Sequence, residues 1–275
     1  MIDRPALIAW RSQAPWPNPV QIEQDLLLSR LMIDIARDET LGPELVMRGG
    51  TCLHKLHLPA ALRYSEDLDY VRSTHGGIKP YTQALAKVAE GVGLTVSSRQ
   101  RSGQMVHVYF DGQPTEGLGR IRIKIEMNIA EIEPYRPRKT IPHTVETSWW
   151  SGTADIPTFQ TSELLATKLR ALYQRSKGRD LFDLWLGLTV LKADPEQIVA
   201  GFNHYMGDAT FSFPELRDNL AAKLATTSFR RDLDALTTHL PAGYNPDTAA
   251  DLVMRELGSR LRNAPPAEEI GPLHQ

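Results

Sequence analysis

Apolar residues recur at helical spacing in several long segments of the chain. Between residues 20 and 37, leucines and isoleucines return every three or four positions, which predicts a strong amphipathic helix. Four prolines within residues 1–19 predict an irregular arm before this helix. The same helical spacing predicts further helices over residues 51–57, 79–92, 161–175, 179–191, 195–206, 214–225, 229–239 and 246–262.

A different period, of two residues, marks the strands. Residues 120–128 alternate without a break, which predicts a strand with one packed face and one polar face that meets solvent or a site. The polar positions of this strand are Arg120, Arg122, Lys124, Glu126 and Asn128. Further strands are predicted over residues 44–48, 63–72, 94–99 and 105–111, and a proline-rich connection over residues 134–157.

The order of these elements predicts the fold class. Strands precede an uninterrupted series of helices, so we expect an α+β domain over residues 1–157 followed by an all-helical domain over residues 158–275.

Composition narrows the class of protein. The 275 residues include one cysteine, Cys52, which excludes an internal disulfide framework and paired-cysteine zinc sites. No apolar run approaches the roughly 18 to 20 residues of a membrane span, and no signal peptide opens the chain, so we expect a cytoplasmic protein without a membrane partner. With 31 Lys and Arg against 33 Asp and Glu, any contact with nucleic acid must come from local basic patches.

The most informative segment joins a glycine turn to a pair of carboxylates. Gly49 and Gly50 separate a predicted strand from a short helix that Thr51 can cap, and backbone N–H groups at such a turn suit phosphate. Asp67 and Asp69 lie two residues apart on the next strand and therefore share a face, where two hard oxygen ligands suit Mg²⁺. The alternative is an ordinary tight turn beside a solvated strand face. The spacing of the two motifs favours a functional site.

Glu126 is the natural third carboxylate. A strand beside Asp67 and Asp69 could place all three around one or two metal ions. The alternative is a surface glutamate paired with Lys124 or Arg122 along the same polar face.

A second informative segment lies in the predicted helices over residues 161–191. Lys168 and Arg175 fall within the apolar stripe of their helix, and an inward-facing cation needs a carboxylate or an anionic ligand. Asp180 and Asp183 share one side of the next helix. The alternative is an internal salt-bridge network in which Arg175 and Arg179 hold the two aspartates; Lys168 has no obvious local partner in the sequence.

Two basic clusters could contact RNA phosphates, and their alternative is a solvated polar surface. They comprise Arg120, Arg122 and Lys124 on the alternating strand, and Arg136, Arg138 and Lys139 in the connection after it.

Together the two segments resemble the AbiEii/AbiGii toxin family, which includes the MenT-like toxins and belongs to the polymerase-β-like nucleotidyltransferases. The first part of the resemblance is carried by Gly49, Gly50, Thr51, Arg63, Ser65, Asp67 and Asp69. The second part is carried by Lys168, Ala171, Leu172, Arg175, Arg179, Asp180 and Asp183. The resemblance covers residues 20–191. The serine of the superfamily's Gly-Ser pair is Gly50 here, so its phosphate contact falls to the backbone or to Thr51.

The resemblance implies a mixed sheet with flanking helices and a nucleotidyltransferase reaction at the first motif. Asp67 and Asp69 would hold Mg²⁺, with Mn²⁺ as an alternative, on a bound nucleoside triphosphate. The turn over residues 49–51, with Arg63 and Ser65, would bind the nucleotide.

The helical segment would complete the reaction. Lys168, with Arg175 or Arg179, would neutralise the leaving pyrophosphate. Glu126, Asp180 or Asp183 would complete the metal site or take the proton of the attacking hydroxyl.

The implied acceptor is the 3′ end of tRNA, whose modification blocks translation, and the implied protein partner is a cognate antitoxin. Two alternatives remain: a nucleotidyltransferase with a small-molecule acceptor such as an antibiotic, or with a protein acceptor; and a nucleotide-binding partner protein without turnover.

Overall fold

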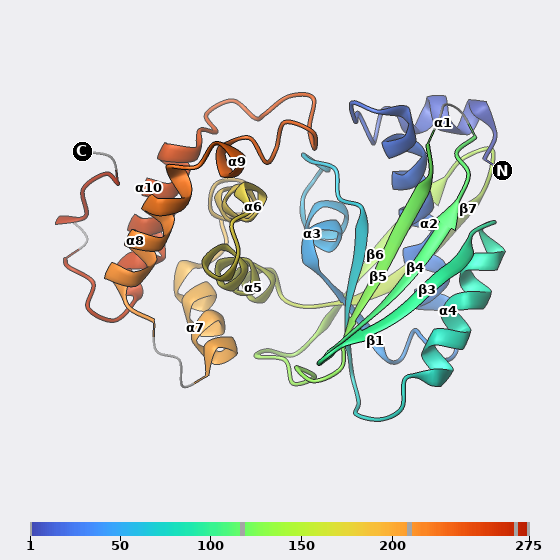
Figure 1. The fold of residues 1–275 in the computed structure, drawn as a ribbon, viewed down its shortest axis with the longest axis horizontal. Coiled ribbons are helices and arrows are strands. Elements are labelled where there is room, and N and C mark those ends of the chain that lie inside the picture. The colour runs from blue at the N-terminus through green and yellow to red at the C-terminus, as the bar shows by residue number, and fades with distance from the viewer. Residues whose placement is uncertain (1, 116–118, 208–210, 267–268, 274–275) are drawn as a thin grey trace. The chain divides into compact units, whose positions relative to one another are not determined.

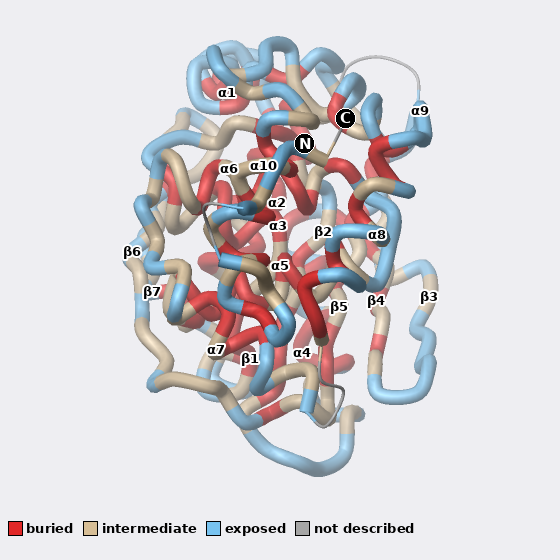
Figure 2. The backbone as a smooth tube through the Cα atoms, turned by 90° about the vertical axis from the view of Figure 1, so that its left-hand side faces the viewer, coloured by how far each residue is buried: buried red, intermediate tan, exposed pale blue. Residues whose placement is uncertain are grey.

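The computed structural model describes residues 2–115, 119–207, 211–266 and 269–273. The chain divides into two compact units, the first over residues 1–159 with 236–238 and the second over residues 160–235 with 239–275. Figure 1 labels most of the elements of both units, and Figure 2 also labels β2. No helix in the described part of the chain is long and apolar enough to cross a membrane.

The first unit contains one mixed sheet. Its seven described strands are ordered β3-β4-β5-β2-β1-β7-β6; β2 pairs parallel with β5, β1 pairs parallel with β7, and the other neighbours are antiparallel. The strands span β1 (Leu45–Arg48), β2 (Asp67–Arg72), β3 (Thr95–Ser102), β4 (Met105–Gly112), β5 (Ile121–Asn128), β6 (Lys139–Glu146) and β7 (Ser151–Thr158). The edge strand β3 is exposed along most of its length (Figure 2).

Helices accompany this sheet, as the resemblance implies. They are α1 (Arg4–Trp10), α2 (Pro19–Arg37), α3 (Gly49–Cys52), which continues as a π-helical turn over Leu53–His57, and α4 (Lys79–Gly91). α2 begins at a capping box in which Asn18 and Gln21 satisfy each other's backbone N–H groups. It packs against strands that include β5 and β7 and so covers part of the core.

The second unit is helical in its described residues. Its elements are α5 (Thr161–Gln174), α6 (Gly178–Thr189), α7 (Pro195–Met206), α8 (Phe213–Leu224), α9 (Thr227–Arg230), α10 (Pro246–Glu256) and a 3₁₀ turn over Gly258–Arg260. The apolar stripe of α5 is buried, with Leu164, Leu165, Leu169 and Leu172 each at most 2% exposed.

The structure corrects four sequence predictions in the first unit. The strand expected over residues 63–72 begins only at Asp67, so Arg63 and Ser65 lie in the connection before it. Residues 134–157 are not a simple connection, because β6 and most of β7 form an antiparallel hairpin there. Pro142 is tolerated because β6 is an edge strand, where a missing N–H leaves no buried partner unpaired. The N-terminal arm contains the short helix α1, which Asp3 caps. Thr51 does not cap α3, because that helix already begins at Gly49.

Two helices of the second unit were predicted too long. α9 ends at Arg230, although a helix was expected to residue 239. α10 ends at Glu256, six residues before its expected end.

Candidate active site

The glycine turn after β1 is built around the side chains of the following strand. Gly49 has a φ of +84°, and a Cβ there would lie 2.0 Å from Oδ2 of Asp69. A Cβ on Gly50 would lie 2.5 Å from Nη2 of Arg63 and 3.1 Å from Oγ of Ser65. The first part of the motif thus comes together in space, with neighbouring side chains taking the room that a larger residue at either glycine would need.

Thr51 fixes the turn to the carboxylate strand. Its hydroxyl is buried and donates a hydrogen bond to the backbone carbonyl of Asp67 at 2.6 Å. A phosphate contact in this turn would therefore come from backbone N–H groups, since the hydroxyl already has a partner inside the protein.

Asp67 and Asp69 share the half-buried face of β2, while Leu68 and Tyr70 point into the core. Burial raises the pKa of Asp67 to about 6. The hydrogen bond and charge of Lys124 oppose this rise, and the negative charge of Asp69 adds to it. The charge of the Asp67 carboxylate is therefore incompletely compensated.

Lys124 lies against this pair, and its position depends on strand register. β2 and β5 run parallel with Asp67 opposite Lys124 and Asp69 opposite Glu126. Nζ of Lys124 lies 2.9 Å from Oδ2 of Asp67 and 3.2 Å from Oε2 of Glu126. Burial alone would lower the pKa of the Lys124 amine, but the hydrogen bond to Asp67 and the nearby carboxylates raise it above its usual value.

His107 extends the cluster onto β4. It stands opposite Glu126 in the β4–β5 register, and its Nε2 lies 3.2 Å from Oε2 of Glu126. No sequence motif marked this histidine. The only sequence signal for His107 was its position on the polar face of an alternating strand. That position does not predict which strand will pair with this one, and so it does not predict the contact with Glu126.

Glu126 therefore forms an ion pair with Lys124, which is the alternative that the sequence analysis gave for this residue. Among the described residues, no three His, Cys, Asp or Glu side chains are grouped so that they could hold a metal ion. Asp67 and Asp69 supply two carboxylates on one face of β2 beside the glycine turn, which fits a Mg²⁺ ion that keeps several waters.

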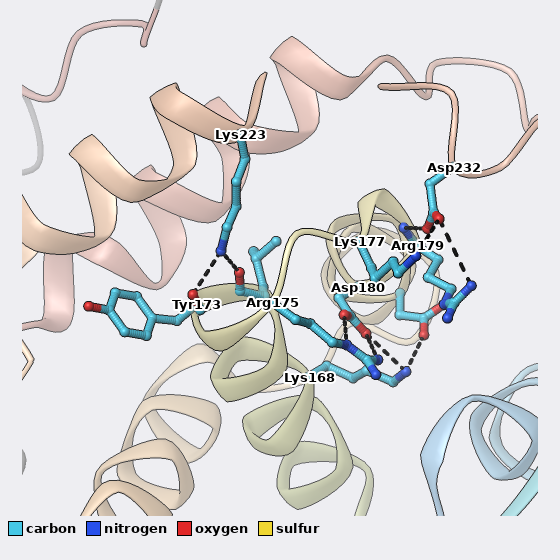
Figure 3. A network of polar contacts seen from close by, with 10 residues as sticks. Lys168, Tyr173, Arg175, Lys177, Arg179, Asp180, Lys223 and Asp232 are labelled. Atoms are coloured by element: carbon cyan, nitrogen blue, oxygen red, sulfur yellow. Dashed lines mark hydrogen bonds and ion pairs between the residues drawn. The ribbon is translucent and has the colours of Figure 1, made fainter. Parts of the chain in front are cut away.

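The second set of predicted residues forms an ion-pair network within the helical unit (Figure 3). Lys168, Asp180 and Asp183 are buried, whereas Arg175, predicted to face inward, has a half-exposed side chain because it lies just beyond the end of α5. Asp180 and Asp183 on α6 are fully buried, and Nζ of Lys168 on α5 lies 3.3 Å from Oδ1 of Asp180 and 2.8 Å from Oδ2 of Asp183. Nε of Arg175 donates to Oδ2 of Asp180 at 2.7 Å. Burial alone would raise the pKa of Asp180, but Lys168 and Arg175 outweigh it and hold the pKa below its usual value.

This network differs in two respects from the one expected. Lys168 has local partners, because the α5–α6 turn brings both aspartates to its ammonium group. Arg179 instead faces Asp232: its backbone N–H donates to Oδ2 at 3.1 Å, and its Nη1 lies 3.9 Å from Oδ1.

The first basic cluster, at the start of β5, faces a carboxylate on β4. Arg120 makes an ion pair with Asp111 at 2.8 Å, and Arg122 lies 3.9 Å from the same carboxylate. The guanidinium of Arg122 is half-exposed and sits 4.5 Å from the centre of the Tyr109 ring. Arg122 is therefore an accessible cation on the polar face of the sheet.

The second basic cluster is partly engaged within the first unit. Arg138 donates to Oγ of Ser73 and to the carbonyl oxygen of Ile132, both at 2.6 Å. Arg136 and Lys139 are half-buried.

The chain also matches a known protein family. Residues 30–255 match the family described as "Nucleotidyl transferase AbiEii toxin, Type IV TA system". The chain belongs to this family. It is accordingly a nucleotidyltransferase of the AbiEii type, which implies a nucleoside triphosphate substrate and an antitoxin partner.

Solved structures show the same fold. The MenT4 nucleotidyltransferase toxin from Mycobacterium tuberculosis H37Rv superimposes with a TM-score of 0.66 at 18% identity, covering 98% of this chain and 94% of that one. The Helicobacter pylori protein JHP933 has a TM-score of 0.50 at 18% identity, covering 86% of this chain and 88% of its own. No curated protein sequence matches the chain.

Proposed function

We propose that this AbiEii-family protein transfers nucleotides from a nucleoside triphosphate to the 3′ end of tRNA in the cytoplasm and so blocks translation. The observation that carries the proposal is the packing of Asp69 against Gly49, since it joins a carboxylate pair to a backbone turn suited to phosphate. The reaction needs Mg²⁺, for which Mn²⁺ can substitute.

The residues of the first unit hold the nucleotide. Backbone N–H groups of residues 49–51 bind its phosphates, with Arg63 and Ser65 beside them. Asp67 and Asp69 hold the Mg²⁺ ion, which when bound neutralises charge on the triphosphate.

Transfer forms a bond between the acceptor 3′ oxygen and the α-phosphorus and breaks the bond to pyrophosphate. The hydroxyl proton passes to a carboxylate, for which Glu126, Asp180 and Asp183 are the candidates. Positioning and electrostatics can supply such catalysis, so no covalent nucleophile is needed.

We assign the cations of the helical unit to the same reaction. Lys168, with Arg175 or Arg179, neutralises the departing pyrophosphate. The contacts of Lys168 and Arg175 with Asp180 support the assignment, because buried carboxylates fix the position of long, otherwise mobile cationic side chains.

A tRNA acceptor is supported by the accessible cation on the sheet. Arg122 stacks on Tyr109, and such an Arg–aromatic pair can contact both a phosphate and an unpaired base.

The test is a transfer assay with total tRNA, Mg²⁺ and each of the four labelled nucleoside triphosphates in turn. We expect one or more nucleotides to label tRNA and Asp67→Ala to abolish labelling. Glu66→Gln is the matched control, because it removes an exposed negative charge one residue away, and it should retain activity.

Other results would redirect the proposal. If the label appears only in protein or in a small molecule, that acceptor and not tRNA is the substrate. Nucleotide binding without pyrophosphate release from any acceptor would favour a binding protein without turnover. Labelling that survives Asp67→Ala would overturn the assignment of the site.

A further inference from the structure

The Lys124 ammonium group bridges two strands at the place where the carboxylates converge. It contacts Oδ2 of Asp67 at 2.9 Å and Oε2 of Glu126 at 3.2 Å. Its side chain is 27% exposed, against 31% for Asp67 and 25% for Glu126, so the group is reached by solvent without being fully solvated. Lys124 is therefore an internal cation at a site of hard oxygen donors.

The contact with Asp67 conflicts with metal binding at the same carboxylate. A Mg²⁺ ion would lie about 2.1 Å from a ligating oxygen, and the ammonium already stands within hydrogen-bond distance of Asp67. A divalent cation and an ammonium this close repel each other strongly at partly buried positions. Both cations cannot keep their best positions on Asp67.

Lys124 belongs to a different strand from the groups that it would leave. It is on β5, whereas the carboxylate pair and the glycine turn belong to β2 and the β1–α3 connection, and its side chain is 27% exposed to solvent. A rotation about its side-chain bonds therefore requires no change in either backbone segment. Glu126 offers it a second anionic partner on its own strand. Leaving Asp67 therefore does not leave the ammonium without a carboxylate nearby.

We propose that Lys124 is a displaceable internal cation: it compensates Asp67 in the metal-free protein and leaves that carboxylate when a divalent cation binds. This inference rests on the metal role proposed for Asp67 and Asp69. Lys124 thus acts against metal binding in the absence of nucleotide, and its ammonium becomes available to an anionic substrate only after displacement.

The first experiment measures Mn²⁺ affinity by electron paramagnetic resonance on the full chain, without nucleotide. Lys124→Gln should bind Mn²⁺ at least about fivefold more tightly than the unmodified protein, because a repelling positive charge is removed. Arg122→Gln is the matched control: it removes a positive charge two residues along the same strand face, from a side chain that lies beside Asp111, and should leave Mn²⁺ affinity within about twofold.

Asp67→Asn separates the metal site from the displacement. If it abolishes Mn²⁺ binding while Lys124→Gln leaves the affinity unchanged or weaker, the displacement is overturned and the metal site stands. If Asp67→Asn retains full Mn²⁺ affinity, the metal site itself is wrong. Equal tightening by Arg122→Gln and Lys124→Gln would also overturn the displacement, because a general charge effect would then account for it.

A second measurement needs no variant. Lysine acylation followed by mass spectrometry should show Lys124 reacting several-fold faster when Mg²⁺ is added. Once the group has left Asp67, it can lose its proton to solvent more readily, and the neutral amine is the form that attacks the acylating reagent. The exposed Lys87 on α4 should react at the same rate with and without Mg²⁺. A Lys124 rate that does not change, or that falls, would overturn the proposal.

Discussion

The carboxylate of Asp69 packs directly against Gly49, so that a Cβ at residue 49 would lie 2.0 Å from its Oδ2. The glycine is also held at a φ of +84°, which other residues adopt only with strain. Two independent demands, backbone conformation and close approach of a site carboxylate, thus converge on one residue.

Replacing this glycine separates the two demands. Gly49→Ala should lower the free energy of unfolding by more than the roughly 1–2 kcal/mol expected for the left-handed conformation alone, and should abolish transfer by displacing Asp69. Gly93 has a similar φ of +79°, and a Cβ there would meet no other atom within 4 Å, so Gly93→Ala should show the conformational cost and keep activity. Urea unfolding measures the stability of the two variants, and the tRNA assay measures their activity. Equal losses of stability and activity in Gly49→Ala and Gly93→Ala would contradict a role for the close approach of Asp69 to residue 49.

The raised pKa of Asp67 predicts a cost in stability. The pKa is about 6 in the folded protein and 3.8 in its ordinary state, so the folded protein binds this proton more tightly, and stability from this group falls as the pH rises from about 4 to about 6. Asp67→Asn removes the charge and should stabilise the protein at pH 7.5 by about 1 kcal/mol, after allowance for partial exposure and the lost contact with Lys124.

The check is urea unfolding at both pH values. The difference between Asp67→Asn and the unmodified protein should shrink towards zero at pH 4, where Asp67 is largely protonated in the folded state. The opposite result would be an Asp67→Asn variant that is less stable than the unmodified protein at pH 7.5 and equally stable at pH 4. It would show that Lys124 fully compensates the Asp67 carboxylate.

The buried network of the helical unit predicts a strong structural effect of Lys168. Lys168→Met leaves Asp183 buried without the lysine and should destabilise the protein by about 3–5 kcal/mol. Adding Asp183→Asn should recover part of this loss, since the uncompensated charge is then gone. Urea unfolding is the measurement, and Arg217→Gln, which breaks the exposed pair with Asp218, should cost less than about 1 kcal/mol.

Activity of these variants tests the proposed role of Lys168. Lys168→Met/Asp183→Asn should remain inactive in transfer even where its stability is restored. Asp183→Asn alone is assayed beside it, because Asp183 is itself a candidate proton acceptor, and the loss due to Lys168 is the difference between the two variants. If the double variant regains both stability and transfer activity, the role of Lys168 is limited to holding α5 and α6 together.

The accessible cation on β5 predicts the salt dependence of tRNA binding. Arg122→Gln should weaken tRNA binding and lower the slope of log affinity against log salt by about 1, as expected for the loss of one phosphate contact. Arg217→Gln on α8 is the control and should leave the slope unchanged. Filter binding between low and moderate salt measures both, and an unaltered slope for Arg122→Gln would remove this residue from the RNA contact.

Local patterns in the sequence determined most of the elements. The helical period predicted α2, α5 and α7 nearly to the residue, because apolar side chains recur at the spacing of a helix face in each. α2 is buried around more of its circumference than an amphipathic helix would be, since residues 22–29 are all buried. Strict alternation predicted β5, because every second side chain of this strand is buried. Pro142 hid β6, because a local pattern cannot show that a strand will lie at a sheet edge. Pro157 hid β7, which lies between β1 and β6 and carries this proline one residue before its end.

The sequence alone also brought together the glycine turn and the carboxylate pair, since both lie within about twenty residues and period two places Asp67 and Asp69 on one face. Only the tertiary structure decided what stands beside them. The parallel pairing of β2 with β5 sets Lys124 opposite Asp67, and the α5–α6 turn brings Lys168 to both buried aspartates. Strand register and helix packing depend on contacts between distant segments, so the partners of each charge are a property of the folded chain.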